Sequence, residues 1–209
     1  MAVVITVAQQ KGGAGKTTLA ANLAAALAEV KRVALVDIDP QRSLARWHVL
    51  RGGRHPAPVQ IGFSELSGWR LGNELDRMRS RYDVLIVDSP PQIDTDARVA
   101  VRGADLVLVP VQPSPPDLWA AEGTLKLAAD ERRKVRLVLN RAPASGKLRA
   151  GMEAEIARHG YPVLATVLGN RTGFAGAFAQ GLGITESEPR STSAQELRGL
   201  LAEIEAVLG

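Results

Sequence analysis

The chain has 209 residues, with 26 lysines and arginines against 22 aspartates and glutamates, which gives a formal net charge of +4. This length can bury a full hydrophobic core, and we expect a single domain over residues 1–209. The absence of cysteine excludes disulfides, thiolate metal sites and cysteine-ligated iron–sulfur clusters. No apolar run approaches the roughly 20 residues of a membrane span, and no signal peptide is expected. These features fit a cytoplasmic protein, and the mild basic excess permits an anionic partner.

Short aliphatic runs alternate with helical patterns along the chain. The runs are rich in valine, isoleucine and leucine, as in parallel strands that are covered on both faces. They predict strands over residues 3–8, 32–37, 59–62, 82–88, 105–111, 135–140 and 163–168. The patterns between them predict helices over residues 16–30, 43–50, 71–81, 94–103, 117–129, 148–158, 174–181 and 194–208. This alternation predicts an α/β fold, a doubly wound and mainly parallel sheet flanked by helices.

A glycine-rich stretch connects the first predicted strand to the first predicted helix. Glycines let the backbone curl so that several N–H groups point at one phosphate, and the helix adds its positive N-terminal end. Lys16 can reach the β- and γ-phosphates of a nucleotide, and the Thr17 hydroxyl can ligate Mg²⁺. The strict P-loop pattern fails only at its first position, which is Gln10. The predicted loop reads Lys11-Gly12-Gly13-Ala14-Gly15-Lys16-Thr17-Thr18.

A second lysine, Lys11, stands five residues before Lys16. One lysine suffices for a loop's own phosphates, so the extra cation could reach phosphates that a second subunit holds. The stretch resembles the deviant Walker A box of the ParA/MinD family of P-loop ATPases. The resemblance implies a P-loop NTPase fold with ATP and Mg²⁺ as ligands. It further implies an ATP-dependent homodimer in which Lys11 crosses the interface to the partner's nucleotide.

Two carboxylates, Asp37 and Asp39, follow the second predicted strand within Asp37-Ile38-Asp39-Pro40-Gln41. Two residues apart, they leave the strand on the same side of the pleat. One can hold a Mg²⁺-bound water while the other orients the attacking water, and the alternative is a solvated turn. The segment resembles the first switch of the family. That resemblance assigns activation of the nucleophilic water to Asp39 and contact with metal-bound water to Asp37.

A hydrophobic run over residues 84–87 ends in Asp88, the Walker B arrangement. Asp88 is therefore predicted to hold Mg²⁺ through water, opposite Thr17. The family usually carries threonine after this aspartate, and Ser89 keeps the hydroxyl.

Two later positions take a role only from the resemblance. Asn140 ends a predicted strand, where an asparagine usually caps a turn, yet the resemblance implies that it contacts the adenine base. The proline-rich stretch over residues 109–115 can be a rigid connection between strand and helix. The resemblance implies instead that this loop, with Pro113, lines the nucleotide and the dimer contact.

The last predicted helix argues against a membrane-binding tail. A MinD-like membrane cycler needs a basic amphipathic tail, and residues 194–208 contain three glutamates and one arginine. The leucines and isoleucine of this segment predict packing on the sheet instead. Ser193 followed by Glu196 predicts a capping box at the start of the helix.

Taken over most of the chain, the resemblance is to short, ParF-like ParA partition proteins. It implies an ATPase that dimerises on ATP, binds DNA nonspecifically at the nucleoid and positions a plasmid, chromosome or protein cluster. A ParB-like adaptor would stimulate its hydrolysis. The alternatives are a MinD-like membrane-associated ATPase and a metabolic P-loop relative of the ligase type. Candidate DNA contacts are Lys147, Arg149, Arg171 and Arg190.

Overall fold

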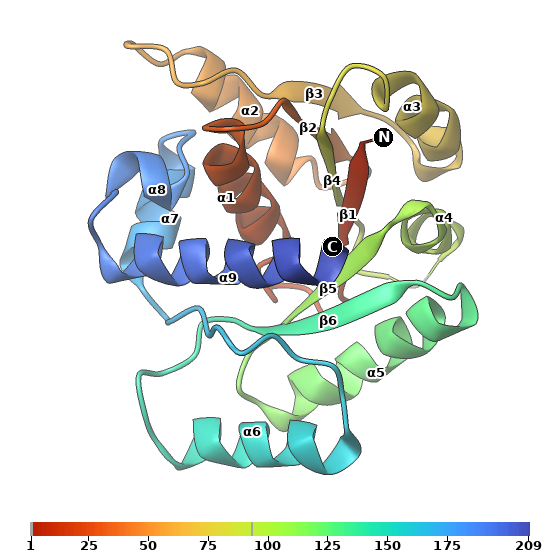
Figure 1. Ribbon diagram of the computed structural model, residues 1–209, viewed down its shortest axis with the longest axis vertical. Helices are drawn as coiled ribbons and strands as arrows, with labels where there is room; N and C mark the ends of the chain where they lie inside the picture. Colours follow the sequence, from red (N-terminus) through yellow and green to blue (C-terminus); the bar gives the residue numbers. More distant parts are fainter. Residues whose placement is uncertain (1, 93) are drawn as a thin grey trace.

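The computed structural model describes residues 2–92 and 94–209. Within these ranges, six parallel strands form one sheet in the order β3-β2-β4-β1-β5-β6. Strand β1 therefore lies between β4 and β5, in the middle of the molecule (Figure 1). This order confirms the predicted doubly wound α/β sheet. The strands are β1 (Val3–Val7), β2 (Val33–Asp37), β3 (Gly62–Glu65), β4 (Val84–Asp88), β5 (Leu106–Val111) and β6 (Lys134–Leu139).

Helices cover both faces of the sheet, because alternate strand residues point to opposite sides. Ile5 and Val7 pack in one hydrophobic cluster, whereas Val4 belongs to another. The first cluster also takes side chains from α1 (Lys16–Ala28), α2 (Ser43–Gly52), α7 (Thr172–Ala179), α8 (Ile184–Ser187) and α9 (Thr192–Leu208). The opposite face is covered by α3 (Leu71–Met78), α4 (Thr95–Gly103), α5 (Pro115–Asp130) and α6 (Lys147–His159).

The predicted seventh strand, residues 163–168, is not formed. Leu164 N donates to Leu137 O (3.0 Å) and Leu168 N to Leu139 O (2.9 Å), so the segment advances four residues while β6 advances two. The two additional residues of the segment cannot form regular backbone hydrogen bonds with β6. The N–H groups of Ala165 and Thr166 donate to the carboxylate of Glu203 on α9 instead, at 2.6 and 2.7 Å.

Other boundaries also differ from the sequence prediction. Strand β3 begins at Gly62, where the predicted strand ended, and a short 3₁₀ turn (Gly68–Arg70) and helix α8 were missed. The predicted capping box of the last helix is wrong, because Ser191 rather than Ser193 caps α9 by accepting from Ala194 N (3.2 Å).

Helix α9 packs on the sheet as its apolar pattern predicted. Leu197, Leu200 and Ile204 are fully or almost fully buried in the same cluster as α1. Across the described ranges, no helix combines the length and the apolar character needed to span a membrane.

Candidate nucleotide site

Strand register brings the three predicted motifs to one edge of the sheet. Val7, at the end of β1, pairs with Asp88 of β4, and Asp88 pairs in turn with Asp37 of β2. The glycine-rich loop leaves β1 directly after this level. Residues that are far apart in the sequence are therefore side by side at the carboxyl ends of neighbouring strands, where doubly wound folds place ligands.

The glycine-rich loop adopts the compact turn that its sequence predicts. Gly15 has a φ of 92° and precedes the first residue of α1. A Cβ atom at this position would lie 2.5 Å from Asn140 Nδ2, so only glycine fits. The loop carbonyls are tied to neighbouring side chains: Ala14 O accepts from Asn140 (2.8 Å), and Gly13 O accepts from Gln112 (3.0 Å) and Arg141 (3.1 Å).

Two cavities of about 330 Å³ each meet at this loop. They share Gly15, Thr18 and Arg141 in their walls, so Arg141 lies between them. The first, which we call the phosphate cavity, contains the predicted loop and Asp39; it is lined by Gly12, Gly13, Gly15, Lys16, Thr17, Thr18, Asp39, Gln41, Ser43, Pro91, Arg141 and Phe178.

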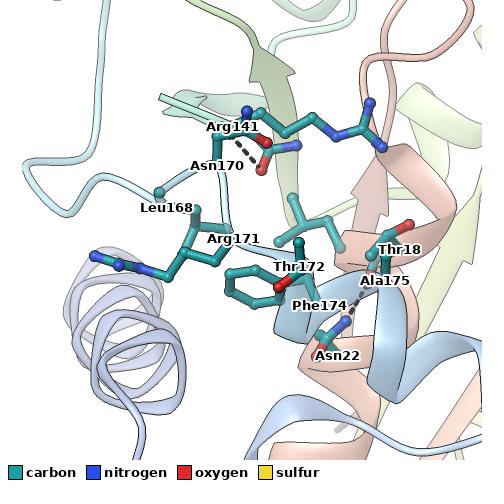
Figure 2. A pocket seen from close by; sticks show the side chains of 13 residues that line it. Thr18, Asn22, Arg141, Leu168, Asn170, Arg171, Thr172, Phe174 and Ala175 are labelled. Carbon is teal, nitrogen blue, oxygen red and sulfur yellow. Dashed lines mark hydrogen bonds between the residues drawn. The ribbon is translucent and has the colours of Figure 1, made fainter. Parts of the chain in front are cut away.

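The second cavity, which we call the base cavity, lies between α1 and the segment that leads into α7 (Figure 2). Its lining includes Asn140, whose contact with the adenine base stays a prediction. Asn140 is held in place by its own bonds, since its amide donates to Ala14 O and its oxygen accepts from Arg141 N (3.0 Å). The remaining wall comes from Gly15, Thr18, Leu19, Asn22, Arg141, Leu168, Gly169, Asn170, Arg171, Thr172, Phe174 and Ala175.

Lys16 lines the phosphate cavity close to the carboxylates of Asp88 and Asp39. Its side chain is buried and its ammonium donates to Gln9 O at 3.1 Å. Burial lowers the pKa of Lys16, whereas the carboxylates of Asp88 and Asp39 raise it. The Lys16 ammonium is therefore placed where it would neutralise phosphates bound in this cavity.

Asp88 is fully buried close to Thr17 and Lys16, and neither of its oxygens has a hydrogen-bond partner among the described residues. Burial raises the pKa of Asp88 to about 8, although the neighbouring Thr17 hydroxyl and Lys16 favour the charged form. An unpaired buried carboxylate is costly unless a cation reaches it. Mg²⁺ commonly binds through few protein oxygens together with waters and phosphates. The residues present therefore fit Mg²⁺, although the described ranges contain no cluster of three acidic, histidine or cysteine ligands.

Asp37 organises the turn that carries Asp39. Its two oxygens accept from Asp39 N and Ala45 N, each at 3.0 Å, so the carboxylate ties the turn to the start of α2. Burial raises the pKa of Asp37 to about 6, and these two bonds lower it. Asp39 itself lines the phosphate cavity. A contact of Asp37 with metal-bound water remains a prediction.

Lys11 is folded back onto its own chain. Its ammonium forms an ion pair with the buried carboxylate of Asp117, in the first turn of α5. The Ser114 hydroxyl donates to the same carboxylate at 2.5 Å. Pro113 is buried in the loop before this helix and does not line either cavity. The proline-rich stretch thus contacts the glycine-rich loop through Gln112 rather than through Pro113, and α5 contacts Lys11 through Asp117.

The candidate DNA contacts fall into two groups. Arg149 pairs with Glu153 (2.8 Å) and Arg171 with Glu196 (2.6 Å), which reduces the charge that each offers to phosphate. Lys147 and Arg190 are exposed and form no ion pair with a described residue.

Several site residues escaped the sequence prediction. Asp117 and Arg141 contact the glycine-rich loop from segments about a hundred residues away, and Phe174 enters the base cavity from α7. The Ser114-x-x-Asp117 pattern was the available signal for the first of these, because it is a helix-capping pattern. No local signal marks Arg141 or Phe174.

Comparison with known proteins identifies the family. Residues 5–184 match the family model of the CobQ/CobB/MinD/ParA nucleotide binding domain. The chain belongs to this family, as the resemblance to ParA and MinD implied. It is 32% identical over 210 residues to maintenance of carboxysome distribution protein A from Halothiobacillus neapolitanus, covering 97% of this chain and 96% of that protein. It is 30% identical over 239 residues to the chromosome-partitioning ATPase Soj from Thermus thermophilus, covering 97% and 95% respectively.

Solved structures of the family share the fold. Apo McdA from Cyanothece matches with a TM-score of 0.82 and 19% identity, covering 98% of this chain and all of that one (100%). MinD from Pyrococcus horikoshii, solved with Mg-ADP, matches with a TM-score of 0.82 and 20% identity, covering 100% and 98%. At these identities the similarity concerns the fold, and it confirms the predicted P-loop NTPase architecture.

The burial of Asp88 predicts how stability changes with pH in the absence of Mg²⁺ and nucleotide. Because burial raises its pKa from 3.8 to about 8, the folded chain keeps a proton that the unfolded chain has lost. The resulting stability is complete below about pH 4 and is lost as the pH rises toward 8. In Asp88→Asn this loss disappears. We expect the free energy of unfolding of Asp88→Asn, measured relative to wild type, to increase by about 3–4 kcal/mol between pH 5 and pH 8.

Urea unfolding in the presence of a chelator at both pH values measures this difference. A difference between variant and wild type that stays constant over the range would contradict the raised pKa. Added Mg²⁺ and nucleotide should stabilise wild type more than Asp88→Asn, since their binding requires the charged carboxylate.

Proposed function

We propose that this ParA/MinD-family protein is an ATPase that dimerises on ATP, binds DNA nonspecifically and positions or segregates a large cargo. The observation that carries the proposal is the phosphate cavity: Lys16, Thr17 and Asp39 line one space, and the carboxylate of Asp88 lies close to them without a hydrogen-bond partner among the described residues. Two relatives that match almost the whole chain support the cargo role, since one is named for carboxysome distribution and the other for chromosome partitioning.

In this proposal the phosphates of ATP lie in the phosphate cavity and the base in the base cavity. Lys16 and the N–H groups of the glycine-rich loop hold the phosphates, and Thr17 with Asp88 holds Mg²⁺. When bound, Mg²⁺ would neutralise charge on the phosphate oxygens. Asp39 orients the attacking water, and Asp37 keeps the turn of Asp39 in place.

Lys11 is the residue through which we propose that ATP links two chains into a dimer. In the single chain, Asp117 holds the Lys11 ammonium, and the Lys11 side chain is 41% exposed. A second nucleotide-loaded chain facing Lys11 would offer phosphates that compete with Asp117 for the same cation. We infer that Lys11 exchanges its own Asp117 for the partner's nucleotide on dimerisation.

The remaining parts of the proposal concern partners. The protein acts in the cytoplasm on the nucleoid, where two modest basic surfaces joined in the dimer bind DNA phosphates. An adaptor protein of the ParB type, or an equivalent, stimulates hydrolysis and releases the DNA. The packing of α9 into the core leaves no basic amphipathic tail within residues 192–208 for a membrane, which favours DNA over lipid.

ATP binding and hydrolysis are tested by separating two side chains of the phosphate cavity. Lys16→Ala should lose tight ATP binding, because the buried cation on the phosphates is gone. Asp39→Ala should bind ATP about as tightly as wild type but hydrolyse it at least about tenfold more slowly, since the water loses its orienting carboxylate. Calorimetry and phosphate release measure the two effects. Wild-type turnover in Asp39→Ala would assign water activation to another residue.

Dimerisation is tested at Lys11. Lys11→Ala should still bind ATP but fail to form ATP-dependent dimers, because the cation that reaches the partner's phosphates is missing. Asp117→Asn should favour dimers at lower ATP concentration, because it frees Lys11 from its own chain. Sedimentation with and without ATP measures both. ATP-dependent dimers of Lys11→Ala with wild-type affinity would exclude the role across the interface.

DNA binding is tested with Lys147 and Arg190, the two candidate DNA contacts that form no ion pair with a described residue. Replacing Lys147 and Arg190 with glutamate should weaken binding to unrelated duplexes by at least about tenfold, and wild-type binding should fall steeply with salt. The matched control replaces Arg81 and Arg132 with glutamate, which gives the same change in charge. These two residues precede β4 and β6, at the amino ends of the strands and away from the nucleotide site. Equal losses in both variants, or binding to one DNA sequence alone, would contradict the proposed surface.

A further inference from the structure

One wall of the base cavity is formed by a segment that makes only some of its backbone hydrogen bonds to β6 and the residues after it. Residues 168–175 supply seven of the lining residues, from Leu168 to Ala175. Near its start, the segment follows β6 and the residues after it: Leu168 N donates to Leu139 O (2.9 Å), and Asn170 N donates to Ala142 O (2.8 Å). Because N–H groups of an extended chain alternate in direction, the N–H of Gly169 between them points away from β6.

Helix α9 supplies the missing partner. Glu196 accepts from Gly169 N at 3.0 Å, and the same carboxylate pairs with the Arg171 guanidinium at 2.6 and 3.1 Å. In Figure 2 the Arg171 side chain leaves the cavity wall and points toward α9, while Thr172 and Phe174 lie on the cavity side. One carboxylate on α9 thus fixes two residues of the wall from behind.

A second glutamate of α9 makes the same kind of contact away from the cavity. Glu203 accepts from Ala165 N and Thr166 N, two residues that line neither the base cavity nor the phosphate cavity. Glu196 and Glu203 are seven residues apart and so lie on one face of the helix. Only Glu196 reaches the part of the segment that forms the cavity wall.

We propose that Glu196 is a positioning residue for nucleotide binding, which holds the wall segment Leu168–Thr172 in the conformation that receives the base. This inference rests on the proposed ATP-binding function. Its physical basis is preorganisation: a wall that is already ordered before binding does not have to be ordered by the ligand. Without Glu196, the Gly169 N–H and the Arg171 guanidinium lose their shared partner, and part of the binding free energy is spent on ordering the segment.

The proposal separates the base end of the ligand from its phosphate end. The glycine-rich loop and Lys16 hold phosphates without contact to Glu196, so a ligand that lacks a base should not depend on this residue. Inorganic tripolyphosphate with Mg²⁺ is such a ligand. ATP occupies both cavities and tripolyphosphate only the phosphate cavity, so their affinities report on the two ends separately.

The experiment compares wild type with Glu196→Ala, Glu196→Gln and Glu205→Ala. Glu205 lies on the same helix, but its carboxylate pairs with Lys31 (2.5 Å) instead of the wall segment, so it is the matched control. We expect Glu196→Ala to weaken ATP binding about tenfold and tripolyphosphate binding less than twofold. Glutamine keeps an acceptor for Gly169 N and should restore part of the loss, and Glu205→Ala should match wild type.

Amide hydrogen exchange without nucleotide gives a second, ligand-independent readout. In Glu196→Ala the exchange of residues 168–172 should become at least about tenfold faster, with residues 165–166 unchanged. Equal weakening of ATP and tripolyphosphate, unchanged ATP affinity in Glu196→Ala, or the same loss in Glu205→Ala would each overturn the role of Glu196. A wild-type protein that binds neither ligand would instead refute the proposed ATP-binding function.

Discussion

The candidate site depends on the unshifted register of three neighbouring parallel strands. Backbone hydrogen bonds between β1, β4 and β2 place Val7, Asp88 and Asp37 at one level. A slip of one residue would turn Asp88 to the opposite face of the sheet, because side chains alternate along a strand. The buried aliphatic residues on both faces fix this register, so the hydrophobic packing of the sheet also determines where the charged groups meet.

That alignment places several buried charged groups, incompletely paired with one another, at the carboxyl ends of the strands. Asp88 is buried without a partner among the described residues, Asp37 is buried with two backbone donors, and Lys16 is the buried cation between the carboxylates and the cavity. A divalent cation and a polyanion together would compensate both kinds of charge. A magnesium–nucleotide complex supplies both kinds of charge, so these buried groups suit such a ligand.

The two ends of the site are built in different ways. The phosphate cavity centres on one local stretch, the glycine-rich loop, to which other segments add Asp39 and a few more side chains. Gly15 fits in this loop because it lacks a Cβ atom, and Asn140, directly after β6, braces the loop. The base end is assembled from α1, the residues after β6 and the segment before α7, which α9 holds through Glu196. The final helix therefore contributes to the site without entering it, although its apolar residues already have a role in the core.

The sequence by itself determined the sheet, the glycine-rich loop and the aspartates at the strand ends, because each depends on a short local pattern. Aliphatic runs predicted all six strands, although β3 lies further along the chain than predicted, and the strand-loop-helix order predicted the turn between β1 and α1. Only the tertiary structure decided that residues 163–168 leave the ladder, that Lys11 pairs with Asp117, and that Arg171 is held by Glu196. These outcomes depend on competition between partners distant in sequence. The apolar pattern of 163–168 suits a strand, but two surplus residues opposite β6 and an available carboxylate on α9 redirect its N–H groups.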